Sequence, residues 1–146
     1  TFHKMEDADW DLVYRVHVEG AYKVTRAAWP HMREQNYGRV IFTASTSGIY
    51  GNFGQSNYGM AKLGLYGLTR TLALALAPRI RVNAIGPGPV LRSIHQSEAD
   101  FAAEVESVPL RRQTELAEIC RAIGFIVSAR SMTGQMIALD GGQHLS

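Results

Sequence analysis

Apolar residues recur at spacings of three and four along the first part of the chain, beginning with Trp10, Val13 and Tyr14. A stripe with this period lies along one face of an α-helix, so it predicts a long helix near the start. Two further stretches carry helix-starting residues followed by apolar and small residues. The predicted helices cover about residues 7 to 35, 56 to 77 and 114 to 129.

Short β-rich runs bounded by turn residues separate these helices, and each run is interpreted as a buried strand. The predicted strands cover about residues 39 to 44, 79 to 85 and 135 to 140. Gly48, Gly51 and Gly54 predict a loop before the second helix. The Gly-Pro-Gly-Pro sequence at 86–89 predicts a sharp turn after the second strand.

Residues that cap helices stand near both later helix starts. Ser56 is suited to accept a hydrogen bond from the first turn of the second helix. Thr114 and Glu118 resemble a capping box, although the glutamate follows at four positions rather than three.

The second predicted helix is rich in small residues, including Gly59, Gly64 and Gly67. Each glycine costs a helix about 1 kcal/mol relative to alanine, so several of them predict close approach by another helix. Close packing of this helix on its own sheet is the alternative.

The composition indicates one globular domain. The chain has 146 residues, of which 46% are hydrophobic and 19% charged, and the charges that give the net +2 are interspersed. The sequence shows no basic patch or acidic tail, so neither nucleic-acid binding nor a membrane-surface role is expected. The longest apolar stretch is interrupted by Thr69, Arg70 and Thr71 and is too short to span a bilayer.

The first residues lack the basic and apolar regions of a signal peptide, which predicts a cytoplasmic protein in a reducing compartment. Cys120, the single cysteine, has no partner for an internal disulfide and is expected to be a small buried hydrophobe. A reactive thiol is the alternative. The histidines show no ligand spacing, so no metal site is expected.

Residues that suggest chemistry lie between Ser45 and Lys62. Tyr58 and Lys62 are four positions apart in a predicted helix, so their side chains share one face. An ammonium group there is expected to lower the pKa of Tyr58 from about 10 and make the phenol a usable general acid or base. Ser45 ends a predicted strand, where ligands of open α/β sheets bind, and is suited to hydrogen-bond the same substrate oxygen. Thr46 and Ser47 are weaker alternatives for that role.

Four features in this order resemble the short-chain dehydrogenase/reductase family. They are Ser45, the Tyr-x-x-x-Lys pair at 58 and 62, Arg-Val-Asn-Ala-Ile-Gly-Pro-Gly at 81–88 and Asp-Gly-Gly at 140–142. The resemblance implies a Rossmann-like α/β fold with a doubly wound parallel sheet, of which this chain holds the C-terminal half with about three strands. It also implies an oxidoreductase that uses NAD or NADP to interconvert a carbonyl and a secondary alcohol on a small-molecule substrate.

The resemblance assigns catalytic roles to the central residues. Ser45 holds the substrate oxygen, Tyr58 exchanges its proton, and Lys62 lowers the pKa of Tyr58. Tyr58 and Lys62 also belong to the cofactor site, with Lys62 on the nicotinamide ribose. In the family, an asparagine of the preceding helix presents its main-chain carbonyl to a water that leads to the lysine. His17 stands at the matching position and can supply the same carbonyl; a core histidine satisfied by its neighbours is the alternative.

The resemblance also assigns the segment after the second strand to the cofactor. Pro87 and Gly88 lie against the nicotinamide, and the backbone of Val90 contacts its carboxamide. Ser93 stands near the position of a threonine that binds cofactor phosphate. The acidic amphipathic stretch 94–108 is expected to close over the active site and set substrate choice.

Members of the resembled family are usually longer than this chain. Residues 1–146 are therefore interpreted as a partial domain that lacks the N-terminal Gly-rich turn, which holds the cofactor pyrophosphate. NAD and NADP are distinguished in that missing part, so both stay open. The alternative to a catalyst is a non-catalytic half-domain that acts as a fragment, a split-enzyme subunit or an oligomerisation module.

The two halves of the chain resemble different subgroups. The first half is similar to the (3R)-hydroxyacyl-CoA dehydrogenase portion of peroxisomal multifunctional enzymes, which favours a 3-oxoacyl or 3-hydroxyacyl thioester substrate. The second half, from Leu72, is similar to small bacterial reductases of pteridines and dihydromonapterin. Family members commonly pair through the second helix and the one before it, so a homodimer or tetramer is expected. A peroxisome is the alternative location, although the terminal His-Leu-Ser is not the usual peroxisomal ending.

Overall fold

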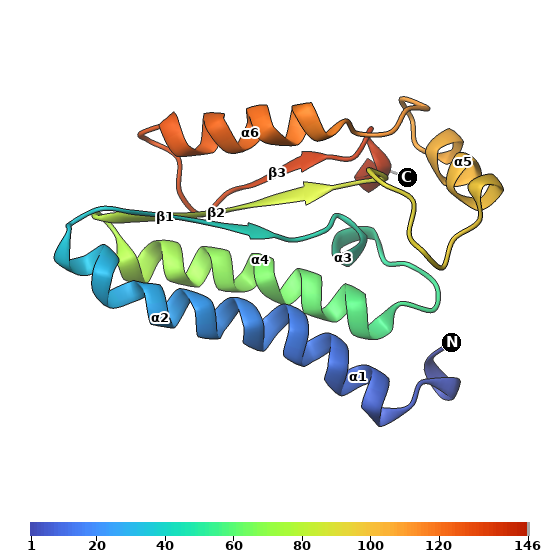
Figure 1. The fold of residues 1–146 in the computed structure, drawn as a ribbon, viewed down its shortest axis with the longest axis horizontal. Helices are drawn as coiled ribbons and strands as arrows, with labels where there is room; N and C mark the ends of the chain where they lie inside the picture. Colours follow the sequence, from blue (N-terminus) through green and yellow to red (C-terminus); the bar gives the residue numbers. More distant parts are fainter. Residues whose placement is uncertain (146) are drawn as a thin grey trace.

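The computed structural model describes residues 1–145 and shows a parallel three-stranded sheet (Figure 1). Its strands are β1 (Gly38–Thr43), β2 (Ile80–Pro87) and β3 (Met136–Leu139). They lie in the order β1-β2-β3, and both neighbouring pairs are parallel. The predicted α/β fold with about three parallel strands is thus confirmed.

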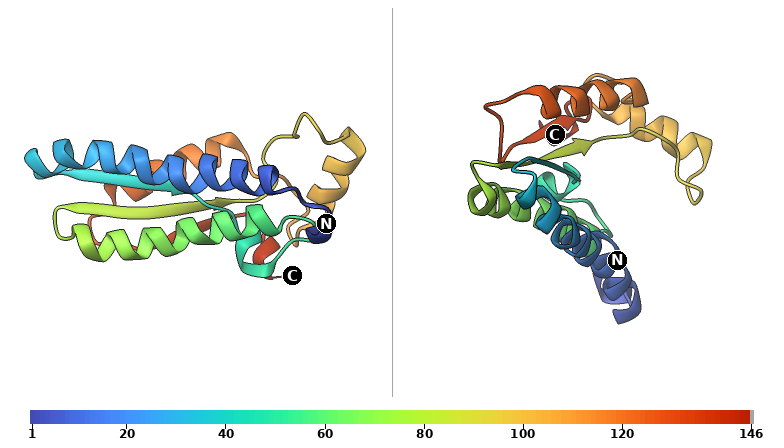
Figure 2. Two further views of the ribbon diagram at one scale, coloured as in Figure 1. Left: turned by 90° about the horizontal axis from the view of Figure 1, so that it is seen from below. Right: turned by 60° about the vertical axis from the view of Figure 1, so that its left-hand side comes forward.

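Helices cover both faces of this sheet. They are α1 (Asp7–Tyr14), the π-helical turn η2 (Arg15–Glu19), α2 (Gly20–Glu34), α3 (Ser47–Tyr50), α4 (Ser56–Leu76), α5 (Glu98–Ser107) and α6 (Leu116–Ser128), with 3₁₀ turns η1 (Phe2–Lys4) and η3 (Gln143–Leu145). The pair α2 and α4 lies on one face and α6 on the other, which gives three layers (Figures 1 and 2). The predicted first helix is thus one run from α1 to α2, with a π-helical turn in its middle.

The core lies between the sheet and α4. Its buried apolar residues are Phe42, Ala44, Leu65, Ala73, Ile80, Val82 and Ala84. Trp29 and Met32 of α2 pack against the edge of this cluster. A fully buried Val, Leu, Ile or Phe side chain contributes roughly 1.5–3 kcal/mol, so this layer fixes α4 on the strands and with it the residues that α4 carries.

A buried arginine joins β2 to the end of α6 on the opposite face. The guanidinium of Arg81 donates hydrogen bonds to the carbonyls of Ile126 at 2.9 Å, Val127 at 2.6 Å and Met132 at 2.9 Å. The last carbonyls of a helix have no partner within the helix, so Arg81 satisfies them and anchors α6 to the sheet.

Several expected details differ in the structure. Ser56 is the first residue of α4 and does not cap it. The capping box of α6 joins Glu115 to Glu118, because these two residues have the required spacing of three, whereas Thr114 donates its hydroxyl to the Leu139 carbonyl. The helix α3 lies inside the predicted loop, and β2 continues to Pro87 into the predicted turn.

Cys120 is exposed, so the expectation that it is buried was wrong. The helix α6 packs on the sheet through the face that carries Ile126, and Cys120 lies on a different face. Over residues 1–145, no helix is both long and apolar enough to cross a membrane.

Candidate active site

The carboxyl ends of β1 and β2 and the first turns of α4 meet at one end of the molecule, at the right of Figure 1. Ser45 follows β1 closely, whereas Tyr58 and Lys62 lie in the first two turns of α4. The fold therefore brings together residues from a strand end and from a helix face, which is where ligands of open α/β sheets bind.

A small hydroxyl network holds Ser45. Its Oγ lies 2.8 Å from the Oγ of Ser47, and the backbone N–H of Ser47 donates to the same Ser45 oxygen at 3.3 Å. The Ser45 hydroxyl also acts on the Tyr58 phenol and lowers its pKa. Ser45 is thus the serine that interacts with the phenol. Ser47 holds the Ser45 hydroxyl through its own hydroxyl and its backbone N–H.

Lys62 is anchored between β1 and the ring of Tyr58. Its Nζ donates to the Thr43 carbonyl at 2.9 Å and lies 5.4 Å from the centroid of the Tyr58 ring. The lysine is only 6% exposed. A cation at this distance from an aromatic ring is attracted by its electron-rich face, so the ring and the carbonyl together hold the ammonium group.

The pKa values of the pair differ from the expected ones. Burial raises the pKa of Tyr58, and the hydrogen bond with Ser45 offsets part of this effect. Burial also lowers the pKa of Lys62. The expected lowering of the pKa of Tyr58 is therefore wrong for this structure, because desolvation outweighs the stabilisation of the phenolate.

The π-helical turn η2 places His17 beside Tyr58. In this turn the N–H of Gly20 bonds to the carbonyl of Arg15, five residues earlier. The imidazole and phenol rings meet edge to face, with centroids 5.6 Å apart and planes at 88°. Burial and the nearby charge of Lys62 lower the pKa of His17. Single π-helical turns are frequent at functional sites, so the backbone conformation at His17 is also typical of a functional site.

Asn57 belongs to the same cluster, although the sequence analysis does not single it out. Its side-chain carbonyl accepts a hydrogen bond from the N–H of Tyr58 at 2.8 Å, and its amide donates to the carbonyl of Asp9 at 3.2 Å. Asn57 therefore ties the start of α4 to α1. Its place next to Tyr58 is the signal that the sequence offers.

The predicted cofactor segment begins where β2 passes the turn after β3. A Cβ at Gly88 would lie 2.6 Å from the Cα of Asp140, and the Gly88 N–H donates to the Leu139 carbonyl at 3.0 Å. Such a close backbone approach requires glycine. The glycine of the predicted Pro87-Gly88 pair thus has a packing reason within this chain.

The other two residues of this segment lie in different environments. Val90 is half-buried, whereas Ser93 lies on the exposed loop that leads to α5. The Ser93 Oγ accepts a hydrogen bond from the N–H of His95 at 3.3 Å. The structure thus keeps Val90 near the end of β2 and places Ser93 farther out along the loop.

Asp140 braces the turn against which Gly88 packs. The carboxylate is buried and accepts hydrogen bonds from the backbone N–H groups of Gly142 at 3.1 Å and His144 at 2.9 Å. Its Oδ2 also lies 2.9 Å from the Nδ1 of His144. Burial alone would raise the pKa of Asp140, but hydrogen bonds from His144 and from the backbone of the turn outweigh it and lower that pKa. The Asp-Gly-Gly sequence is thus a structural brace at this end of the sheet.

Comparisons with known proteins agree with this fold. A family profile described as enoyl-(acyl carrier protein) reductase matches residues 1–144. The chain is 39% identical over 144 residues to the 3-oxoacyl-(acyl-carrier-protein) reductase FabG of Thermotoga maritima, which covers 95% of this chain and 58% of the relative. Over 88 residues it is 59% identical to peroxisomal multifunctional enzyme A of Dictyostelium discoideum, which covers 60% of this chain and 20% of that enzyme.

A solved structure gives the same picture. The crystal structure of FolM alternative dihydrofolate reductase 1 from Brucella suis, in complex with NADP, matches with a TM-score of 0.91 and 42% identity. The match covers 97% of this chain and 57% of that one. The chain therefore spans somewhat more than half the length of this reductase.

The layered α/β fold, with Ser45, Tyr58 and Lys62 at one end of the sheet, is Rossmann-like. The chain belongs to the short-chain dehydrogenase/reductase family. The resemblances to hydroxyacyl dehydrogenases and to small bacterial reductases are both confirmed.

Proposed function

We propose that this chain carries the catalytic part of an NAD- or NADP-dependent oxidoreductase that interconverts a carbonyl and a secondary alcohol. The observation that carries the proposal is the cluster in which the Lys62 ammonium is held over the Tyr58 ring and the Ser45 hydroxyl acts on the Tyr58 phenol. A phenol and a hydroxyl that lie side by side are suited to polarise the carbonyl oxygen of a substrate and to supply its proton.

The protein residues handle the proton and the substrate oxygen. When bound, the nicotinamide supplies or accepts the hydride. Ser45 donates a hydrogen bond to the carbonyl oxygen, and Tyr58 gives that oxygen its phenolic proton during reduction. Lys62 stabilises the phenolate that Tyr58 leaves behind. In the oxidation direction, Tyr58 takes the proton back from the alcohol.

The residues present suit one half of the cofactor. An ammonium group has three N–H donors, and within residues 1–145 the Lys62 side chain uses one of them, toward Thr43. The others are suited to ribose hydroxyls, while Pro87, Gly88 and Val90 form the backbone surface for the nicotinamide. We infer that the part of the family fold that holds the pyrophosphate and adenosine lies outside residues 1–146, and Ser93 has a minor phosphate role at most.

A titration of the 146-residue chain with NADH and NADPH tests that inference. The chain is expected to bind neither dinucleotide tightly, because the phosphate and adenosine contacts are missing. Binding with a submicromolar Kd would overturn the interpretation as a partial domain.

The favoured substrate is a 3-oxoacyl or 3-hydroxyacyl thioester. Relatives with this chemistry in their names include the 3-oxoacyl-(acyl-carrier-protein) reductase above and an acetoacetyl-CoA reductase of Allochromatium vinosum, 37% identical over 147 residues. The loops around the site also expose large apolar side chains, namely Phe53, Leu91 and Ile94. Apolar side chains at a site entrance suit an acyl chain. A pteridine is the second candidate, supported by the similarity to the dihydrofolate reductase structure.

The direct test is turnover by the complete gene product. Oxidation of NADH and NADPH is followed with acetoacetyl-CoA, a longer 3-oxoacyl-CoA and dihydrofolate in parallel. Turnover that rises with acyl chain length is expected, because the longer chain covers more of the apolar loops. Turnover with dihydrofolate alone would replace the thioester by a pteridine, and no turnover with any carbonyl substrate would overturn the proposed reaction.

We further propose that the molecule forms a dimer or tetramer through α2 and α4. The buried face of α4 carries Ala61 and Ala73, whereas Gly64 and Gly67 lie on its exposed face with no atom within 4 Å of an added Cβ. These two glycines thus do not serve packing on the chain's own sheet. The exposed Leu74 lies on the same side two turns after Gly67, so the stripe is apolar as well as narrow.

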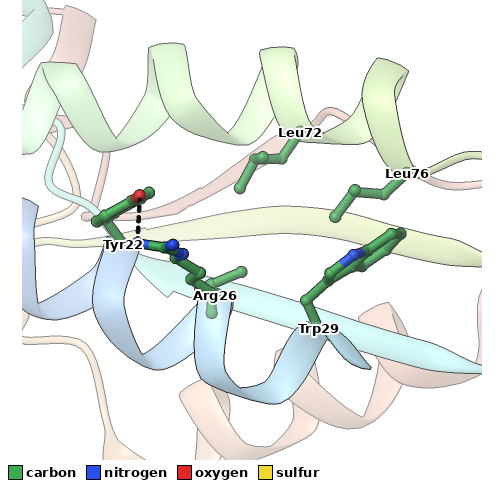
Figure 3. Close-up of a pocket in the computed structure, with 6 residues that line it drawn as sticks. Tyr22, Arg26, Trp29, Leu72 and Leu76 are labelled. Carbon is green, nitrogen blue, oxygen red and sulfur yellow. Dashed lines mark hydrogen bonds between the residues drawn. The ribbon is translucent and has the colours of Figure 1, made fainter. Parts of the chain in front are cut away.

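A groove lies between α2 and α4. Figure 3 shows Tyr22, Arg26 and Trp29 of α2 opposite Leu72 and Leu76 of α4. The groove has a volume of about 310 Å³, and Arg26 donates to the Tyr22 hydroxyl at 3.3 Å along its rim. An apolar groove between two helices is suited to receive the same helix pair from a second copy.

The second candidate function is a non-catalytic subunit that needs a partner chain. The strand β1 is paired on one side, with β2, and within residues 1–145 its other edge has no strand beside it. An unpaired strand edge is a surface for pairing with another chain. The intact mass of the native gene product separates the candidates: a product longer than this chain supports a complete enzyme, and a mass of 16.1 kDa supports a split subunit.

The location in the cytoplasm, with the peroxisome as the alternative, stays a prediction. Fractionation of the source cells would test it.

A further inference from the structure

The imidazole of His17 has no role in the proposed reaction, although its position is notable. The family resemblance uses the main-chain carbonyl at this position, which any residue supplies. In the structure the His17 side chain is half-buried and turned toward α4, where it contacts Tyr58. This contact with the proposed proton donor suggests that the side chain of His17 has a role of its own.

The contact has the geometry of a specific aromatic pair. The two ring planes stand at 88°, and the centroids are 5.6 Å apart. Edge-to-face pairs at such distances are favourable beyond the burial of their surface and favour one rotamer of a tyrosine by up to about tenfold. The pair therefore restrains the direction of the phenol.

Tyr58 has a second neighbour, Lys62, which carries a positive charge. The Lys62 ammonium lies 5.4 Å from the same ring and is held there by the Thr43 carbonyl. A second positive charge at His17 would repel this ammonium. The cluster is therefore compatible with one cation, and the imidazole has to stay neutral beside it.

We propose that His17, in its neutral form, is a positioning residue that fixes the phenol of Tyr58 and leaves Lys62 as the cation beside it. The proposal rests on the proposed function, because it assigns the proton transfer to Tyr58. It places the role of His17 in its ring and not in its carbonyl. It also makes the site sensitive to the protonation of His17.

Burial and the neighbouring charges explain how His17 stays neutral. The charged and titratable groups on the segments packed around it include Asp11 and Tyr14 of α1, Arg15 and Glu19 of η2, Lys23 of α2, and Tyr58 and Lys62 of α4. Glu19 is occupied by a salt bridge with Lys23 at 2.6 Å. Burial, followed by Lys62, lowers the pKa of His17 below its ordinary value of 6.5. The imidazole is thus neutral at neutral pH and takes up a proton only as the pH falls through that lowered value.

Three substitutions at position 17 separate the ring from the carbonyl. His17→Phe keeps an aromatic ring and cannot be protonated, His17→Asn restores the amide of the family, and His17→Ala removes the side chain. All three keep the main-chain carbonyl. The experiment measures kcat and KM of the complete gene product over a range of pH.

The ring role predicts a definite order of activities. His17→Phe should keep kcat within about threefold of the parent and lose the fall in kcat at acid pH, because no second cation forms. His17→Ala and His17→Asn should lower kcat by about tenfold or more with little change in KM, because the phenol is no longer held in place. Equal kcat in the alanine variant and the parent would overturn the proposal. Parent-like kcat in the asparagine variant, with loss in the phenylalanine variant, would overturn it as well, since an amide and not a ring would then be required.

A measurement without turnover keeps this result separate from the proposed reaction. The C2 proton of His17, assigned by its absence from the His17→Phe spectrum, is titrated by NMR in the parent and in Lys62→Met. The pKa of His17 should rise in Lys62→Met because a neighbouring cation is gone. An unchanged pKa would overturn the placement of His17 beside Lys62. Failure of the parent to turn over any carbonyl substrate would instead overturn the proposed reaction and, with it, the positioning role.

Discussion

The helix pair α2 and α4 has two ends of different chemical character. At the amino end of α4, buried polar groups are held by individual partners, as Lys62 is by the Thr43 carbonyl. Toward the other end, the same helices form an apolar groove, with Trp29 facing Leu72 and Leu76 (Figure 3). The helix pair therefore presents a polar cluster at the strand ends and an apolar surface about three to four turns away.

The difference follows from the free energy of each end in the absence of a partner group or partner surface. A buried ammonium group is unfavourable unless it is paired, so Lys62 is retained only with partners that offset its desolvation. An exposed apolar stripe costs little folding free energy but favours association with another surface. The site end is thus expected to control turnover, and the groove end is expected to control assembly.

The largest expected effect comes from Tyr58→Phe in the complete gene product. This change removes one oxygen, and with it the proton that the reaction transfers. Turnover should fall by about 10³-fold, within the range that general acid–base groups contribute. The free energy of unfolding should change by no more than about 1 kcal/mol, because the ring and its contact with His17 remain.

Tyr66→Phe is the matched control for this variant. Tyr66 lies on the same helix, two turns beyond Tyr58, and its ring has Arg70 nearby. It should turn over like the parent. Turnover of Tyr58→Phe within about threefold of the parent would exclude Tyr58 as the proton donor, since the phenolic proton would then not be needed.

The next effect is on assembly, from Leu74→Asp at the groove end. Leu74 is 85% exposed in the single chain, so the fold should tolerate a carboxylate there. If the stripe is buried against a second copy, an unpaired carboxylate costs at least about 3 kcal/mol, and the Kd of the oligomer rises by about 100-fold or more. Analytical ultracentrifugation over a range of concentrations measures this change.

Leu116→Asp on α6 is the control for assembly. Leu116 is also exposed, but it belongs to α6, which lies on the opposite face of the sheet. It should leave the oligomer unchanged. An oligomer that is unaffected by Leu74→Asp would place the interface elsewhere.

The two ends also differ in how far the sequence predicts them. The site end contains residues whose types and spacing carry chemistry, and the structure brings Ser45, Tyr58, Lys62 and His17 into one cluster. The groove end has no such motif. From the sequence, the glycines of α4 could pack either against another helix or against the chain's own sheet. Only the burial of each position shows that Gly64 and Gly67 face outward.

The environment of each group lies beyond the sequence. Spacing places Lys62 one turn from Tyr58, but the depth of burial decides the pKa, and here burial raises the pKa of Tyr58. Asn57 and Asp140 act through contacts with residues far apart in the chain or with turns, which local patterns do not reveal. Cys120 shows the same limit, because an apolar helical run does not tell which face is outside.

A third prediction concerns the dependence of stability on pH at the site end. Hydrogen bonds from His144 and from the backbone outweigh burial and lower the pKa of Asp140 below its ordinary value of 3.8. Its stabilising contribution is therefore present above that ordinary value and is lost as the pH falls through the lowered pKa. The difference in free energy of unfolding between the parent and Asp140→Asn should be larger at about pH 6 than at about pH 2.

Asp11→Asn, a change of an exposed carboxylate on α1, is the control for that measurement. Denaturant unfolding at the two pH values is sufficient for the comparison. A difference for Asp140→Asn that does not shrink at the lower pH would mean that the carboxylate does not provide the stabilising charge.

The smallest effect, and the one that separates folding from assembly most clearly, is expected from Gly67→Ala. Within the single chain no atom lies within 4 Å of the added methyl, so the helix should gain up to about 1 kcal/mol of stability. In an oligomer the same methyl would enter a close helix contact and weaken association.

Gly124→Ala on α6 offers a matched control, because its added methyl, also in a helix, meets no atom within 4 Å. Both variants should raise the free energy of unfolding at low protein concentration, where the chain is monomeric, and only Gly67→Ala should raise the Kd of the oligomer. Equal effects of the two changes on association would show that Gly67 does not lie in the contact between chains.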